Sequence, residues 1–238
     1  MIRRQKSMRF LGGFFAFPGG KVEAADGSDE ALARCRGISE WAARAAFPAA
    51  DGIPPLAFWV TAARELLEET GLLAGCDADG RPVDPRDEPV RARVERLRHA
   101  VVAEEAPFPA LLAREGWYLD LAAFRYLSHF ITPPSNPIRF TARFFLAPVP
   151  PGQEPRLLGG EASESFWIDP AEGHRRFLAG QMPMAEPADC GLGYIAGFDT
   201  LEAVWAAHTD GRHKFHGILD RIEAAGFSIP RSRRVGRT

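Results

Sequence analysis

The chain has 238 residues, of which 46% are hydrophobic, so it can bury a full core without disulfides or structural metal ions. A net charge of −2 argues against nucleic acid as a partner, and no apolar run reaches the roughly 20 residues that span a membrane. The three cysteines, Cys35, Cys76 and Cys190, form no CxxC pair, so we expect no disulfide framework or zinc site, and a cytoplasmic location.

The first third of the chain predicts an extended segment followed by two helices. Residues 9–17 are aromatic and glycine-rich, and they lead into the turn Pro18-Gly19-Gly20. Ser28 is a typical cap for a helix over residues 29–46. A proline-containing loop then precedes a second helix over residues 56–70, and Gly71 stands where helices commonly end.

The rest of the chain mixes strands and helices without regular βαβ alternation. An acidic loop over residues 77–89 lacks the spacing of a calcium loop, so we interpret it as solvated. Patterns of apolar and turn residues predict helices at 90–105, 110–115, 170–178, 200–207 and 214–225, and strands at 121–131, 139–147 and 165–168. The expected fold class is therefore α/β in the broad sense, including α+β.

The second predicted helix carries the clearest chemistry. Glu65, Glu68 and Glu69 have i, i+3, i+4 spacing, so they share one helix face, where three carboxylates repel one another. An all-oxygen cluster suits Mg²⁺ or Mn²⁺. An ordinary surface helix with acids facing water is the simpler interpretation of these glutamates alone. The combination with Arg64 and the upstream Gly19-Gly20 turn favours a metal site.

These residues resemble the Nudix hydrolase motif: a glycine, five residues, a glutamate, seven residues, then Arg-Glu-aliphatic-x-Glu-Glu-x-Gly-aliphatic. Residues 64–72 match every fixed position of its second half, namely Arg64, Glu65, Leu66, Glu68, Glu69, Gly71 and Leu72. Gly20 takes the place of the first glycine, and Asp26 stands where the glutamate would be. Thirty-seven residues separate Asp26 from Arg64 instead of seven, so the motif contains an insertion of about 30 residues.

The split motif looks like the coenzyme A diphosphatase branch, especially its peroxisomal-type members. Residues 128–133, 139–145 and 164–170 are similar to the strands that follow the motif in that branch. Thr141-Ala142 stands where the branch usually has Asp-Thr, and no separate coenzyme A signature is evident. The resemblance implies an α/β/α sandwich with a mixed sheet, as one domain over residues 1–238. The insertion would span about 27–57, and extra C-terminal helices about 180–230.

The resemblance also implies an activity and a set of site residues. Nudix enzymes hydrolyse the pyrophosphate of a nucleoside diphosphate derivative with Mg²⁺ or Mn²⁺; here coenzyme A or acyl-coenzyme A is one candidate substrate. Glu65, Glu68, Glu69 and the Gly20 carbonyl would bind metal, and Arg64, Glu65 and Glu68 would be catalytic. One alternative is a non-catalytic domain that binds a nucleotide ligand as a sensor. Another is an interaction protein whose match to the motif is accidental.

Several roles stay open at this level. Candidates for the general base are Glu68, Glu161, Glu164 and His129, although a hydrogen-bonded strand residue is the better interpretation of His129. Asp26 is either an acid that supports the site or a loop cap.

Substrate contacts and the role of the insertion are equally open. Arg139 and Arg143 occupy alternate strand positions that share a face, so we expect them to bind substrate phosphates or to face solvent, and Glu164 is a third candidate for substrate binding. The helix within the insertion would form a lid or acyl-chain pocket, but packing on the domain or a homodimer interface is the favoured interpretation. A Nudix domain normally begins with a strand before the segment that starts here at Met1, so either the start is late or another segment fills that sheet edge.

Overall fold

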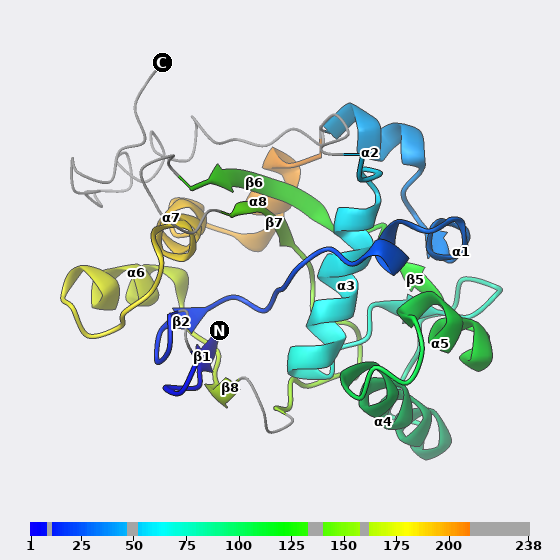
Figure 1. Ribbon diagram of the computed structural model, residues 1–238. Coiled ribbons are helices and arrows are strands. Elements are labelled where there is room, and N and C mark those ends of the chain that lie inside the picture. Colours follow the sequence, from blue (N-terminus) through cyan, green and yellow to red (C-terminus); the bar gives the residue numbers. More distant parts are fainter. Residues whose placement is uncertain (9–10, 47–51, 133–139, 158–161, 210–238) are drawn as a thin grey trace. The chain divides into compact units, whose positions relative to one another are not determined.

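The computed structural model describes residues 1–8, 11–46, 52–132, 140–157 and 162–209 (Figure 1). Contacts divide the chain into two compact units, which are described separately. Unit 1 lies within residues 1–17, 127–144 and 160–238, and unit 2 within residues 18–126 and 145–159. The prediction of one domain over residues 1–238 stays a prediction. None of the helices in the described ranges is long and apolar enough to cross a membrane.

Unit 2 combines helices with a small mixed sheet. Its three strands are ordered β3-β5-β4, with β3 parallel and β4 antiparallel to β5. The predicted mixed α/β class with a mixed sheet is therefore confirmed. The elements are the 3-10 helix η1 (Ala24–Gly27), α1 (Asp29–Ala33), β3 (Cys35–Arg36), α2 (Glu40–Ala46), α3 (Ala57–Thr70), β4 (Gly75–Cys76), α4 (Glu88–Val102), α5 (Phe108–Glu115) and β5 (Tyr118–Asp120).

Helix α3 passes through the core of unit 2 (Figure 1). Trp59, Ala63 and Leu67 recur at helical spacing and are at most 2% exposed. The Trp59 ring packs 4.9 Å from the Phe145 ring, centroid to centroid. Gly71 ends the helix in the left-handed conformation, with φ of 76°, as its sequence position predicts. The apolar face fixes α3 in the core, which leaves its other face to carry charged side chains.

In its described residues, unit 1 contains an antiparallel sheet and three helices. The sheet order is β2-β1-β8, and Phe15, Met182, Met184 and Leu192 form the centre of its apolar cluster. The elements are β1 (Ile2–Arg4), β2 (Phe15–Ala16), β8 (Ala162–Ser165), α6 (Pro170–Leu178), α7 (Glu186–Ile195) and α8 (Leu201–Ala207). A further two-stranded sheet consists of β6 (Arg125–Ile131) and β7 (Thr141–Leu146), whose residues are divided between the units.

The structure corrects three predicted elements. The predicted helix over residues 29–46 does begin at its Ser28 cap, but it ends at Ala33, after which Cys35 and Arg36 pair with β5. Gly37, with φ of 80°, then turns the chain before α2 begins. The strand predicted from residue 121 starts only at Arg125, because residues 121–124 form a hydrogen-bonded turn. The strand predicted at 165–168 lies at 162–165, and the helix predicted at 214–225 falls outside the described residues.

Candidate active site

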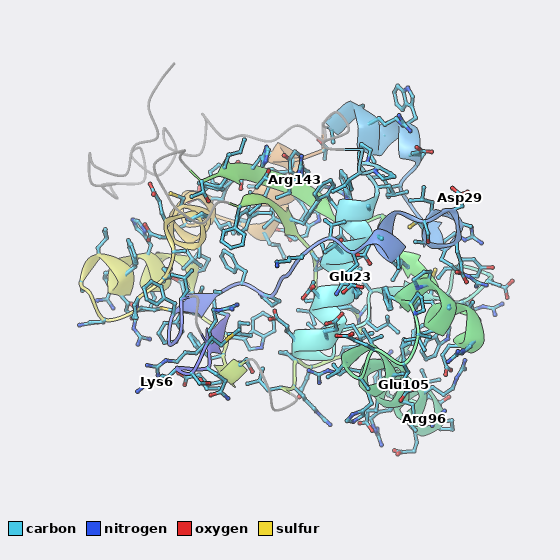
Figure 2. The ribbon with its side chains drawn as sticks, viewed as in Figure 1. Lys6, Glu23, Asp29, Arg96, Glu105 and Arg143 are labelled. Carbon is cyan, nitrogen blue, oxygen red and sulfur yellow. The ribbon has the colours of Figure 1, made fainter. Side chains whose placement is uncertain are left out.

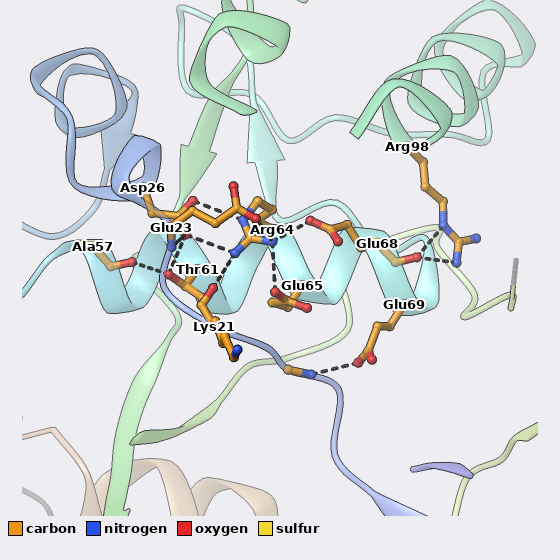
Figure 3. Close-up of polar contacts among 11 residues, drawn as sticks. Lys21, Glu23, Asp26, Ala57, Thr61, Arg64, Glu65, Glu68, Glu69 and Arg98 are labelled. Carbon is orange, nitrogen blue, oxygen red and sulfur yellow. Dashed lines mark hydrogen bonds and ion pairs between the residues drawn. The ribbon is translucent and has the colours of Figure 1, made fainter. Parts of the chain in front are cut away.

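Polar side chains gather in unit 2 where α3 meets the segment that runs from the Gly19-Gly20 turn to η1 (Figure 3). The helix contributes Arg64 and Glu68 from one turn to the next, since residues four apart lie on the same face. η1 contributes Asp26, and the preceding segment contributes the Lys21 carbonyl. The two halves of the split motif are therefore in direct contact across the insertion.

Asp26 is fully buried and its carboxylate accepts four hydrogen bonds. The donors are the backbone N–H of Glu23 at 3.0 Å, the Thr61 hydroxyl at 2.8 Å, and Nε and Nη2 of Arg64 at 3.1 and 3.0 Å. The Glu23 bond forms part of a capping box for η1. Asp26 therefore caps η1 and also pairs with Arg64, while its support of an active site stays a prediction.

Arg64 uses its whole guanidinium to join the two halves of the motif. Nε and Nη2 form the fork to Asp26, and Nη2 also donates to the Lys21 carbonyl at 2.8 Å. Nη1 donates to Glu65 Oε1 at 2.9 Å and to Glu68 Oε1 at 2.6 Å. Burial works to lower the pKa of Arg64, but the hydrogen bonds and charges of Asp26, Glu68 and Glu65 outweigh it and raise that pKa. Arg64 is thus a permanent cation that orients two glutamates.

The Gly19-Gly20 turn approaches the glutamates of α3 closely. The Gly19 N–H donates to Glu69 Oε2 at 2.8 Å. A Cβ atom on Gly20 would lie only 2.1 Å from Glu65 Oε1, so no other residue fits at this position without displacing the carboxylate. Both glycines are exposed, and they mark where the cluster opens to solvent.

The cluster holds more negative than positive charge. Asp26, Glu65 and Glu68 all bond to Arg64, and the Glu23 carboxylate lies 3.5 Å from its Nη1, beside α3 (Figure 2). Burial, helped by the neighbouring charges of Glu68 and Asp26, raises the pKa of Glu65 to about 7 against the opposing effect of Arg64. A cation beside Glu65 would relieve this repulsion.

The donors of the cluster fit Mg²⁺ or Mn²⁺ through their chemistry. Within the described ranges, no group of three or more His, Cys, Asp or Glu side chains lies close enough to hold a metal ion by itself. Mg²⁺ needs no such cage, because it commonly takes one or two carboxylates and completes its shell with waters and substrate phosphates. Glu65 and Glu69 supply carboxylate oxygens, and at Gly20 the missing side chain leaves the space in front of Glu65 open.

The other candidate residues belong to unit 1 or lie outside the described ranges. Arg143 is on β7 (Figure 2), Glu164 on β8 pairs with Arg3 at 3.0 Å, and His129 on β6 shares a 2.6 Å hydrogen bond with Thr141. The hydrogen bond between His129 and Thr141 agrees with the favoured interpretation of His129 as a hydrogen-bonded strand residue. Arg139 and Glu161 lie outside the described residues. The substrate-binding role of Arg139, Arg143 and Glu164 therefore stays a prediction.

Besides Lys21 and Glu23, two further residues of the cluster, Thr61 and Arg98, were not predicted from the sequence. Thr61 lies one turn before Arg64 and is a polar residue within an apolar stretch, which is a signal that could have identified it. Arg98 on α4 donates from Nε and Nη2 to the Glu68 carbonyl at 3.1 and 2.9 Å, and burial lowers its pKa. This contact spans 30 residues and has no local sequence signal.

Comparison with known proteins places the chain in a family. No family model matches it, and no curated protein matches it. A crystal structure of a NUDIX hydrolase from Alicyclobacillus acidocaldarius is similar over 86% of each chain, with 31% sequence identity and a TM-score of 0.67. The chain therefore belongs to the Nudix hydrolase family, and the predicted Nudix-type fold is confirmed. Nudix hydrolases typically depend on divalent metal ions, and membership suggests pyrophosphate hydrolysis.

Proposed function

We propose that this protein hydrolyses the pyrophosphate bond of a nucleoside diphosphate derivative with the help of Mg²⁺ or Mn²⁺. The observation that carries the proposal is the surplus of carboxylates on α3 beside the exposed Gly19-Gly20 turn. Such a surplus is costly for a protein that only needs to be stable, because like charges held at short range repel. It is useful for a protein that must attract a divalent cation and a phosphate substrate together.

The residues have distinct roles in this proposal. Glu65 and Glu69 are the main ligands of the metal ion, supported by Glu68 and the Gly20 carbonyl. When bound, Mg²⁺ or Mn²⁺ would neutralise the pyrophosphate and make a water molecule more acidic. Arg64 keeps Glu65 and Glu68 oriented through Nη1. Glu68 is the general-base candidate that the described cluster contains, and its 24% side-chain exposure leaves it access to a water molecule.

Coenzyme A or an acyl-coenzyme A is the substrate class that the split motif favours. The insertion of about 30 residues between Asp26 and Arg64 supports it, since the resembling branch carries an insertion at the same point. The departure at Thr141-Ala142 opposes it, so other nucleotide derivatives belong in the same test. The alternative is a sensor that binds a nucleotide without hydrolysing it. Loss of the motif carboxylates would indicate a sensor, so the retained Glu65, Glu68 and Glu69 argue against this hypothesis.

A substrate panel with one matched pair of variants tests the proposal. Coenzyme A, ADP-ribose, NADH and dinucleoside polyphosphates are incubated with the protein and Mg²⁺ or Mn²⁺, and phosphorylated products are separated by chromatography. We expect metal-dependent cleavage of at least one compound, which Glu69→Gln reduces by about 100-fold or more. Glu95→Gln is the control, because it makes the same chemical change at an exposed residue of α4 outside the cluster. Tight binding of a panel member without turnover would reject the enzyme hypothesis and favour the sensor.

A further inference from the structure

Thr61 occupies an unusual position in the middle of α3. It is only 6% exposed, and its hydroxyl lies 2.8 Å from Asp26 Oδ2 and 2.9 Å from the Ala57 carbonyl (Figure 3). Both neighbours are hydrogen-bond acceptors, whereas a hydroxyl carries a single hydrogen. A carboxylate attracts that hydrogen more strongly than a neutral carbonyl does. The Thr61 hydroxyl therefore donates chiefly to Asp26.

A second threonine of the same helix shows what the ordinary arrangement looks like. The Thr70 hydroxyl donates to the Leu66 carbonyl four residues earlier, at 2.5 Å, and within the described part of the chain it has no hydrogen bond to a carboxylate. This is the usual behaviour of threonine inside a helix. Thr61 makes the same contact with Ala57 and adds the bond to Asp26. The additional bond is what sets Thr61 apart.

We propose that Thr61 is a positioning residue of the active site, whose hydroxyl allows an aspartate to stand at the glutamate position of the motif. This inference rests on the proposed function. An aspartate side chain is one methylene shorter than a glutamate, so it has less freedom to adjust to Arg64. Thr61 fixes Oδ2, the same oxygen that accepts from Arg64 Nη2 and from the Glu23 N–H. With Oδ2 held, Oδ1 stays available to Arg64 Nε.

The effect of Thr61 reaches the metal ligands through two steps. Asp26 orients the guanidinium of Arg64 through the two-bond fork, and Arg64 Nη1 in turn orients Glu65. Removal of a residue that orients a metal ligand by hydrogen bonding commonly lowers metal affinity or activity by about 10- to 100-fold. Thr61 thus acts on Glu65 without touching it.

Three single variants test this role. Thr61→Val keeps the shape but removes the hydroxyl, Thr61→Ser keeps the hydroxyl, and Thr70→Val removes a hydroxyl from the same helix that has no carboxylate partner. The Mn²⁺ concentration at half-saturation is measured by electron paramagnetic resonance, and kcat and KM are measured on the best panel substrate. We expect Thr61→Val to raise the Mn²⁺ half-saturation about 10-fold and to lower kcat with little change in KM. Thr61→Ser and Thr70→Val should stay within about twofold of wild type.

Equal effects of Thr61→Val and Thr70→Val on Mn²⁺ binding would overturn the proposal, because Thr61 would then be an ordinary helix threonine. Failure of Thr61→Ser to retain wild-type affinity would overturn it as well, since the hydroxyl would not be the group that matters.

An exchange of side chains tests the same idea in the metal-free protein. Asp26→Glu adds a methylene in a fully buried place, and Thr61→Ala removes a methyl and a hydroxyl beside it. Each single change should lower the midpoint of urea unfolding, whereas the double variant should recover most of the loss, because glutamate fills the vacated space and reaches Arg64. Additive losses would overturn the proposal. This measurement needs no metal and no turnover, so it separates failure of the proposal from failure of the proposed function.

Discussion

Each unit of the molecule contains a buried contact between a basic side chain and a carboxylate, and the two pairs are built differently. In unit 1, His174 Nδ1 lies 2.6 Å from Asp189 Oδ1 between α6 and α7, and both residues are at most 1% exposed. One basic group meets one acid, and the pair is sealed from solvent. In unit 2, Arg64 bonds to Asp26, Glu65 and Glu68 beside the exposed Gly19-Gly20 turn. That cluster has surplus negative charge and reaches the surface.

The difference separates a structural pair from a functional cluster. One carboxylate beside one imidazole leaves no cluster of repelling carboxylates, so this pair needs no cation. A surplus of carboxylates around one guanidinium is stable only if the acids stay partly protonated, as the raised pKa of Glu65 indicates, or if a cation arrives. Perturbed groups in an accessible cluster are a common sign of an active site. Three experiments bear on this contrast.

The largest expected effect comes from removing the buried acid of each pair. Asp26→Asn replaces a carboxylate oxygen by an amide N–H₂, which cannot accept hydrogen bonds from Thr61 and Arg64. It also removes one negative charge from beside the buried Arg64 guanidinium. We expect it to lower the free energy of unfolding by about 3 kcal/mol. Asp189→Asn should cost about 1 kcal/mol, because the amide that replaces the carboxylate can keep one hydrogen bond to His174. Urea unfolding measures both, and equal losses would remove the distinction between the two pairs.

A somewhat smaller effect is expected at the turn. Gly20→Ala places a Cβ 2.1 Å from Glu65 Oε1, so the carboxylate or the turn must move by about 1 Å. A displacement of this size at a catalytic group costs about 100-fold in rate, and we expect kcat for the best panel substrate to fall accordingly. Circular dichroism should show the folded state intact, because the turn is exposed. Full activity in this variant would mean that Glu65 needs no fixed position.

The sequence predicts the long helices well, including the helix that carries the second half of the motif. α3 and α6 have strong helical periodicity and defined ends, at Gly71 and Asp169, so their bounds follow from local chemistry. Strands of two or three residues, such as β3 and β4, are too short to show a period of two, and only pairing with β5 defines them. The helix predicted across residues 29–46 failed for the same reason, since Cys35 and Arg36 pair with a strand 84 residues later.

For the site, too, the sequence predicts what depends on local spacing and misses what depends on contacts between distant residues. Glu65, Glu68 and Glu69 share a helix face, which follows from spacing alone. The contacts that cross the insertion, from Arg64 to Asp26 and from Glu69 to Gly19, depend on how the chain returns to α3, and the resemblance to the motif was the only guide to them. Arg98 was beyond reach, because nothing near α4 indicates that its side chain bonds to the Glu68 carbonyl.

The smallest expected effect is the most direct measure of the surplus charge. A ligand that binds only the folded protein stabilises it, by about 1.4 kcal/mol at ten times its dissociation constant. Mn²⁺ should therefore raise the thermal midpoint of the wild type, and chelation by EDTA should reverse the rise. Asp189→Asn should respond to Mn²⁺ as the wild type does, because the balanced pair of unit 1 has no part in binding the ion. Glu65→Gln should lose the response while its metal-free midpoint holds or rises, since one of the repelling carboxylates is gone. If Glu65→Gln instead kept the full response to Mn²⁺, the ion would bind elsewhere, and the surplus charge around Arg64 would need another explanation.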